Sequence, residues 1–140
     1  MATKKNLAVG IVTSLVVGFL SYYVVRHFVF NENLQEELHE AATQLNAKTP
    51  MQLDEETTLD SAAVTGERNF DYYYTLIYKS TEVNKDTVEK YVKPMLVERV
   101  KASSEMNSLK EKEVIFTYNY YGYDGLPAVS IEITPKLYNQ

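Results

Sequence analysis

The stretch Phe70–Tyr78, FDYYYTLIY, has the clearest strand pattern in the chain. Aromatic and β-branched residues of this kind suit the pleated surface of a sheet. Side chains along a strand point alternately to its two faces. One face of this strand would therefore carry Phe70, Tyr72, Tyr74, Leu76 and Tyr78, and the other Asp71, Tyr73, Thr75 and Ile77.

The residues on either side of this strand predict a hairpin followed by a helix. Gly66–Asn69, GERN, has the composition of a turn, and Thr57–Thr65 before it can form the partner strand. Downstream, apolar residues of Lys85–Ala102 recur at helical spacing. Pro94 falls inside this pattern, and a proline there removes a hydrogen bond and kinks the helix. We expect one kinked helix, or two helices, in this region.

A second hairpin is predicted near the C-terminus. Val114–Tyr121 alternates like a strand, and Val129–Ile133 is a shorter apolar strand that ends before Pro135. Asp124-Gly125 between them is typical of a tight hairpin turn, because both residues tolerate positive φ angles. The predicted fold class is α+β: a ββαββ domain with a mostly antiparallel four-stranded sheet and the kinked helix on one face.

The stretch Asn6–Val25, NLAVGIVTSLVVGFLSYYVV, predicts a membrane-spanning helix before this domain. It holds no charged residue, and its helical length of about 30 Å matches the apolar thickness of a bilayer. A cleaved signal peptide needs small residues at its cleavage site, whereas large aromatic residues follow here. A soluble core helix would normally have a polar face. We therefore expect an uncleaved signal anchor.

Lysines indicate the orientation of this anchor. Lys4 and Lys5 precede the span, whereas Arg26 alone follows it closely. The positive-inside rule then predicts a single-pass protein of the inner (plasma) membrane, with a cytoplasmic N-terminus and a periplasmic C-terminal domain. The expected organisation is a cytoplasmic tip and anchor (1–30), an amphipathic juxtamembrane helix (31–49) and a small α+β domain (50–140).

Two stripes of residues are candidates for helix pairing. Small residues recur every four positions in the predicted span, at Gly10, Ser14 and Gly18, a pattern that lets helices approach closely in lipid and is also common in such helices generally. In the next segment the spacing is that of a short coiled-coil seam, at Leu34, Leu38, Ala41 and Leu45. This seam either pairs with a second helix or packs on its own domain.

Composition argues against several classes of function. The chain has no cysteine, so it has no disulfide, thiolate nucleophile or zinc–thiolate site. All 19 acidic residues follow position 30, together with 11 of the 14 basic ones, which disfavours nucleic-acid binding. His27 and His39 lie on different segments, and no Gly-x-Ser-x-Gly elbow or phosphate-binding glycine loop is present. We expect no enzyme activity, metal or cofactor.

Residues 50–135 resemble small uncharacterised bacterial envelope proteins with an N-terminal signal or anchor. The resemblance rests on Pro50 with LDEETTLDS (Leu53–Ser61), FDYYYTL (Phe70–Leu76), Lys93-Pro94 and the final ITP (Ile133–Pro135). It implies a location and a fold and carries no activity with it.

The predicted function is that of an interaction module. One helix cannot cover both faces of the predicted sheet, so either Tyr73, Ile77 and Tyr121 form a partner-binding face or the helix of residues 31–48 covers it. We expect a membrane-anchored extracytoplasmic module that docks a protein partner in the cell envelope, as an accessory or inhibitor-type protein. The alternative is a structural envelope protein that forms homo-oligomers through its transmembrane and juxtamembrane helices.

Overall fold

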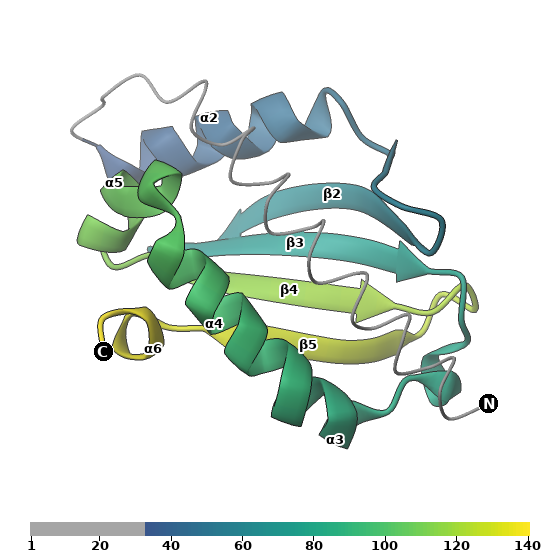
Figure 1. Ribbon diagram of the computed structural model, residues 1–140. Helices are drawn as coiled ribbons and strands as arrows, with labels where there is room; N and C mark the ends of the chain where they lie inside the picture. The colour runs from purple at the N-terminus through teal and green to yellow at the C-terminus, as the bar shows by residue number, and fades with distance from the viewer. Residues whose placement is uncertain (1–32) are drawn as a thin grey trace.

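The computed structural model describes residues 33–140, which fold around one five-stranded sheet (Figure 1). The strands lie side by side in the order in which they occur in the chain. Their bounds are β1 (Met51–Gln52), β2 (Thr57–Thr65), β3 (Asn69–Leu76), β4 (Ile115–Tyr121) and β5 (Pro127–Ile133). β3 and β4 are parallel to each other, and every other neighbouring pair is antiparallel.

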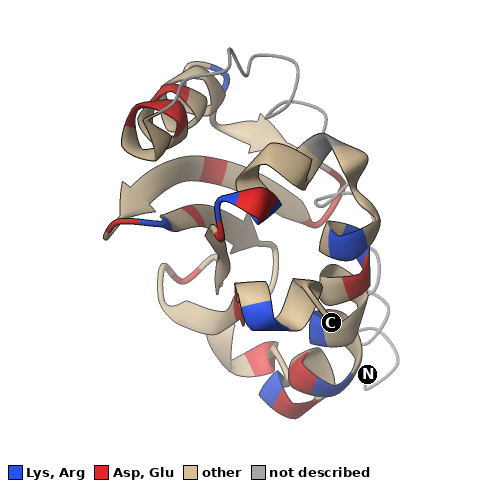
Figure 2. Cartoon of the chain, turned by 90° about the vertical axis from the view of Figure 1, so that its left-hand side faces the viewer, with Lys and Arg blue, Asp and Glu red and all other residues tan. Residues whose placement is uncertain are grey.

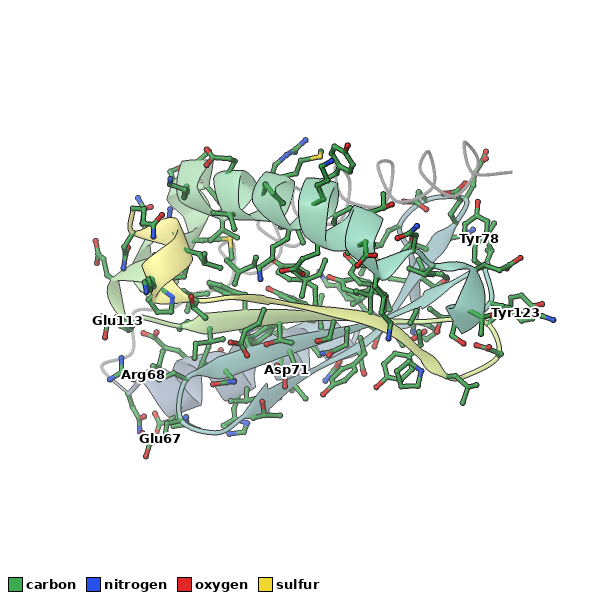
Figure 3. All side chains as sticks on the ribbon, turned by 90° about the horizontal axis from the view of Figure 1, so that it is seen from below. Glu67, Arg68, Asp71, Tyr78, Glu113 and Tyr123 are labelled. Carbon is green, nitrogen blue, oxygen red and sulfur yellow. The ribbon has the colours of Figure 1, made fainter. Side chains whose placement is uncertain are left out.

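Helices surround the sheet unevenly. Their bounds are α2 (Leu34–Asn46), α3 (Lys85–Thr87), α4 (Lys93–Ala102), α5 (Asn107–Glu111) and α6 (Pro135–Tyr138). α4 crosses one face of the sheet, whereas α2 runs alongside β2 (Figure 1). When the sheet is viewed from its edge, α4 lies on only one side of it (Figure 3).

The predicted fold class is wrong in its sheet. A four-stranded, mostly antiparallel sheet was expected, and the structure has a mixed sheet of five strands. The helical connection carries the chain from the end of β3 back to the beginning of β4, so the two central strands run in the same direction. The additional strand, β1, is only two residues long and pairs Met51 with Leu59 and Gln52 with Thr58.

No helix within residues 33–140 is both long and apolar enough to cross a bilayer. The membrane helix predicted at residues 6–25 lies outside the described residues.

The core is built on aromatic side chains of the two parallel strands. Parallel register places Tyr72 beside Tyr118 and Tyr74 beside Tyr120, and their ring centroids are 5.0 and 4.9 Å apart. All four are at most 4% exposed. Buried aromatic rings contribute large apolar areas and additional stacking energy. Helices contribute further residues to the same cluster, among them Leu38 and Leu45 of α2 and Leu96 and Val100 of α4.

The helix that connects β3 to β4 contains a π-helical turn. This turn, Val88–Val92, joins α3 to α4, and Pro94 occupies the first turn of α4. A proline has no backbone N–H to donate and crowds the preceding turn. A π-helical turn just before it widens the helix at that point. Val88 and Val92 in this turn are buried, so the interruption still faces the core.

Candidate interaction surface

One face of the sheet is covered by helix and core, and the other, here called the open face, carries alternate side chains of four strands. Phe70, Tyr72 and Tyr74 of β3 point to the covered face and are nearly inaccessible. The strand register places the opposite side chains in rows across the sheet. The open face includes Thr58, Asp60, Ser61, Ala63, Asp71, Tyr73, Thr75, Thr117, Asn119, Tyr121, Ser130 and Glu132.

Tyr73 and Tyr121 form an aromatic pair on the two central strands of the open face, toward the end where β4 finishes. They come from the parallel strands β3 and β4, and their ring centroids are 6.4 Å apart with planes tilted by 40°. Both side chains are half-buried, and their neighbours in the register are small or polar. Partial burial raises the pKa of Tyr73, and the nearby Asp71 carboxylate and Tyr121 add to this rise. Tyr73 therefore keeps its proton at physiological pH. Both tyrosines present amphipathic rings to solvent.

Polar side chains around this pair are fixed by hydrogen bonds. The Asn119 amide donates to the backbone oxygen of Tyr72 at 3.2 Å, and the Ser130 hydroxyl donates to Asn119 Oδ1 at 2.9 Å. The Thr65 hydroxyl donates to Asp71 Oδ2 at 2.5 Å. Each of these bonds connects one strand to its neighbour. The open face is therefore a hydrogen-bonded platform on which these side chains have fixed positions.

Charges on the open face are all negative. The five strands contain three charged residues, Asp60, Asp71 and Glu132, and no lysine or arginine. Asp60 lies at a bulge in β2, and its carboxylate accepts a 2.5 Å hydrogen bond from the Thr75 hydroxyl, which places it on the open face. Lysines and arginines among residues 33–140 lie on helices and in turns, as the blue segments in Figure 2 show.

An apolar rim lies at the end of the sheet where β3 and β4 finish. It consists of Ile77, Tyr123 and Leu126, which are 56–57% exposed. The backbone N–H of Tyr123 donates to the Tyr78 oxygen at 3.0 Å, which brings the β4–β5 turn against the end of β3 (Figure 3).

Asp124 locks the turn that carries this rim. Its carboxylate accepts from the Ser80 hydroxyl at 2.7 Å and from the backbone N–H of Leu126 at 3.3 Å. These bonds, the one from Ser80 above all, lower the pKa of Asp124. Gly122 permits the close approach, because a Cβ there would lie 2.2 Å from the Ser80 nitrogen. The turn is longer than the two-residue hairpin that Asp124-Gly125 predicted.

A group of buried polar atoms lies beneath the covered face. Five oxygen atoms there lack a hydrogen-bond partner: Asp54 Oδ2, Glu56 Oε2, Thr57 Oγ1, Tyr74 OH and Tyr120 OH. The pKa of Tyr120 is raised, and burial is the largest cause. Nearby Tyr118 and Asp54 make smaller contributions to this rise. The alternation of the strands predicts that Tyr74 and Tyr120 are buried. It does not predict that their hydroxyl groups lack hydrogen-bond partners. Residues 33–140 contain no group of three or more His, Cys, Asp or Glu side chains that could hold a metal ion.

The structure places the sequence-predicted site residues as follows. Gly10, Ser14 and Gly18 lie outside the described residues. The seam residues Leu34, Leu38, Ala41 and Leu45 lie on α2, and all four pack on their own domain: Leu38 and Leu45 are buried in its core, and Leu34 and Ala41 contact it. Tyr73 and Tyr121 are brought together on the open face, and Ile77 lies just beyond β3 in the apolar rim.

α2 does not cover the tyrosine pair. It lies along the outer side of β2, where the Asn46 side chain bonds to the backbone of Ala62 and the Gln35 side chain bonds to the backbone of Gly66 and Glu67. Sequence reasoning missed the acidic character of the open face. Its signal was available, because the predicted strands contain acidic residues and no basic ones.

Solved structures with a similar fold come from bacteria. A Pseudomonas aeruginosa protein described as secreted has a TM-score of 0.64 and 16% identity, over 78% of this chain and 98% of that one. A pilotin of the type II secretion system of Vibrio cholerae has a TM-score of 0.54 and 13% identity, over 75% and 92% of the two chains. The corresponding pilotin of Vibrio vulnificus has a TM-score of 0.57 and 10% identity, over 75% and 91%. At these identities the likeness establishes the fold alone.

Sequence comparison places the chain in a family. No curated protein matches the sequence significantly. The model of a family described as a domain of unknown function, DUF8479, matches residues 33–125, which include α2 and the first four strands. Because this match spans most of the chain, the protein belongs to the DUF8479 family.

Proposed function

We propose that this protein is an extracytoplasmic interaction module that binds a protein partner through the open face of its sheet. The observation that carries the proposal is the pair Tyr73–Tyr121, which lies half-exposed on a hydrogen-bonded platform. Tyrosine is enriched in protein interfaces because its ring is apolar and its hydroxyl remains able to hydrogen-bond. The module would act by binding and not by catalysis.

Two further features support this proposal. The apolar rim, Ile77, Tyr123 and Leu126, extends the accessible apolar surface beyond the tyrosine pair at one end of the sheet. Exposed apolar groups that gather in one region are typical of interaction sites. The fold is shared with two proteins named as secretion-system pilotins and with one described as secreted. We infer from them that the chain works outside the cytoplasm, as an accessory component of an envelope assembly.

The alternative of self-assembly through the α2 seam is not favoured by the structure. Leu38 is fully buried and Leu45 is 3% exposed, and both contact the core of their own domain. A second helix could reach them only if α2 left the sheet.

Site-specific photo-cross-linking in living cells tests the proposed binding face. A photoreactive amino acid replaces Ser130, an exposed residue of the open face, in the full-length protein. The matched control carries it at Tyr91, which is 58% exposed on the helical side. We expect a discrete adduct with another protein from position 130 and none from position 91. An adduct confined to position 91 would contradict the proposal.

A second measurement separates a binding role of the tyrosines from a structural one. Tyr73→Ser combined with Tyr121→Ser should remove the adduct at position 130 while the thermal unfolding transition persists. If the double variant unfolds instead, these tyrosines belong to the core and the open face is not their site of action.

Location is tested separately with the full chain fused at its C-terminus to alkaline phosphatase, which is active only outside the cytoplasm. An active fusion is expected. An inactive but stable fusion would overturn the extracytoplasmic location and leave the binding face to be judged by the cross-links.

A further inference from the structure

We propose that the segment bound by the open face is basic, with lysine or arginine side chains placed over the Tyr73–Tyr121 pair. This inference rests on the proposed function and specifies the chemistry of the partner. It follows from the sign and position of the charges around the tyrosine pair.

The strands carry charge of one sign only. Asp60, Asp71 and Glu132 are the only charged residues in the five strands, and each lies on the open face. Basic residues among positions 33–140 are confined to helices and turns (Figure 2). A surface that presents one sign of charge attracts segments of the opposite sign and repels acidic ones.

The carboxylates lie close to the two tyrosines on the sheet. Asp71, Thr117 and Glu132 form one row across β3, β4 and β5, and Tyr73 lies in the next row. Adjacent rows on one face are separated by two residues, roughly 7 Å, and adjacent strands by about 4.8 Å. On the other side of the pair, Asp60 is held next to Thr75, the register neighbour of Tyr121. Carboxylates therefore flank the aromatic pair on two sides.

Aromatic rings and carboxylates can bind one cation together. A guanidinium or ammonium group within about 6 Å of a tyrosine ring is attracted by the ring face. The same group would remain within reach of a carboxylate in the neighbouring row. Small neighbours on β2, Ser61 and Ala63, leave the rings accessible from above.

The hydrogen bonds of this face also favour a cationic ligand. Asp71 and Asp60 each already accept a hydrogen bond from a threonine hydroxyl, which fixes the orientation of the carboxylate. Asp71 is only 7% exposed, so Asp60 and Glu132, which are exposed, are the carboxylates that a partner can reach most directly. Glu132 is exposed and has no hydrogen-bond or ion-pair partner within the described residues. Oriented acceptors without a nearby cation are suited to donors that a partner supplies.

The test uses the adduct from position 130 as its readout, in the full-length protein. Asp60→Asn combined with Glu132→Gln removes two charges while nearly conserving side-chain volume. We expect the adduct yield at limiting partner concentration to fall roughly threefold to tenfold, because each exposed ion pair contributes modestly. Glu132→Lys should lower it further. The matched control is Glu98→Gln, which removes an exposed charge from α4.

Salt and the identity of the cross-linked peptide supply independent readouts. Higher ionic strength should lower the adduct yield of the wild-type protein more than that of the charge-neutral variant. Mass spectrometry of the adduct should locate the partner's cross-linked peptide beside lysine or arginine residues. A cross-linked peptide that is acidic or uncharged would overturn the inference.

The variants distinguish this inference from the proposed function. If the tyrosine substitutions remove the adduct but the charge variants retain it fully, the open face binds a partner whose segment is not basic. If neither set of variants changes the adduct, the open face is not the binding site and both proposals are wrong. Thermal unfolding of each variant confirms that it remains folded in either case.

Discussion

Asn46 and Ala62 are joined by two hydrogen bonds of 2.7 Å. The Asn46 side chain donates to the Ala62 oxygen, and the Ala62 backbone N–H donates to Asn46 Oδ1. The last residue of α2 thus occupies the position that a neighbouring strand would take on the outer side of β2. β1 pairs with Leu59 and Thr58 only, so this side chain continues the edge of the sheet where β1 ends.

Replacement of Asn46 by alanine should therefore destabilise the fold. The variant leaves one backbone donor and one acceptor of Ala62 without their partners, and we expect a loss of about 1–3 kcal/mol in the free energy of unfolding. Chemical denaturation measures this loss. Gln44→Ala on the same helix is the control, because Gln44 bonds only to Glu40 on the solvent side, and it should change stability by less than about 0.5 kcal/mol. Equal losses in the two variants would contradict the role of Asn46.

The strands could be predicted from sequence because their alternation is strong. The predicted strand Thr57–Thr65 coincides with β2, and Phe70–Tyr78 contains most of β3. Pairing was harder to predict, because alternation fixes the face of each side chain but not the direction of the neighbouring strand. A strand–helix–strand connection favours parallel pairing of the two strands. The prediction of a mostly antiparallel sheet neglected this preference.

Contacts that are distant in sequence could not be predicted from local pattern. In the sequence Asn46 is an ordinary polar residue near a helix end, and its two hydrogen bonds depend on the position of α2 beside β2. The pairing of Tyr73 with Tyr121 on one face required the parallel register of β3 and β4. Their presence on an uncovered face was one of two alternatives that the sequence left open, because the position of α2 was not encoded locally.

Two buried tyrosines should respond in opposite ways to loss of their hydroxyl groups. The Tyr120 hydroxyl is buried without a hydrogen-bond partner, whereas the Tyr138 hydroxyl donates to the Val114 oxygen at 2.7 Å. Tyr120→Phe removes an unsatisfied polar group and should stabilise the protein by about 1 kcal/mol. Tyr138→Phe leaves a buried carbonyl without its donor and should cost about 1–2 kcal/mol. Thermal denaturation of both variants tests the contrast, and a loss of stability in Tyr120→Phe would show that its hydroxyl has a partner in solution.

Alkaline pH should unfold the protein through its buried tyrosines. Burial raises the pKa of Tyr138 from 10.0 to about 12, and it raises the pKa values of Tyr72, Tyr74, Tyr118 and Tyr120 as well. The unfolded state therefore loses protons first, so stability is complete below pH 10 and is lost as the pH rises toward 12. The near-ultraviolet absorbance of tyrosinate should rise in the same transition that abolishes the circular dichroism signal. Tyrosinate absorbance that rises fully before the fold is lost would contradict this linkage.

Glu113, two residues after the last residue of α5, adopts a left-handed backbone conformation with φ of 59°. Its N–H donates to the Lys110 oxygen and the Val114 N–H donates to the Leu109 oxygen, each at 3.1 Å, which is the Schellman pattern of a helix end. Glycine adopts this conformation without the steric cost that a Cβ imposes. The ion pair of Glu113 with Arg68 is exposed and 3.7 Å long, so it contributes little.

Glu113→Gly should therefore stabilise the protein by about 0.5–1 kcal/mol, after allowance for the greater freedom of glycine in the unfolded chain. Glu111→Gly is the matched control: it removes a carboxylate two residues away but places glycine inside α5, where it should cost up to about 1 kcal/mol. Chemical denaturation of both variants measures the two shifts. Relief of the left-handed conformation is expected at position 113 only. If Glu113→Gly also destabilises the protein, the Glu113 side chain stabilises this turn by more than its backbone conformation costs.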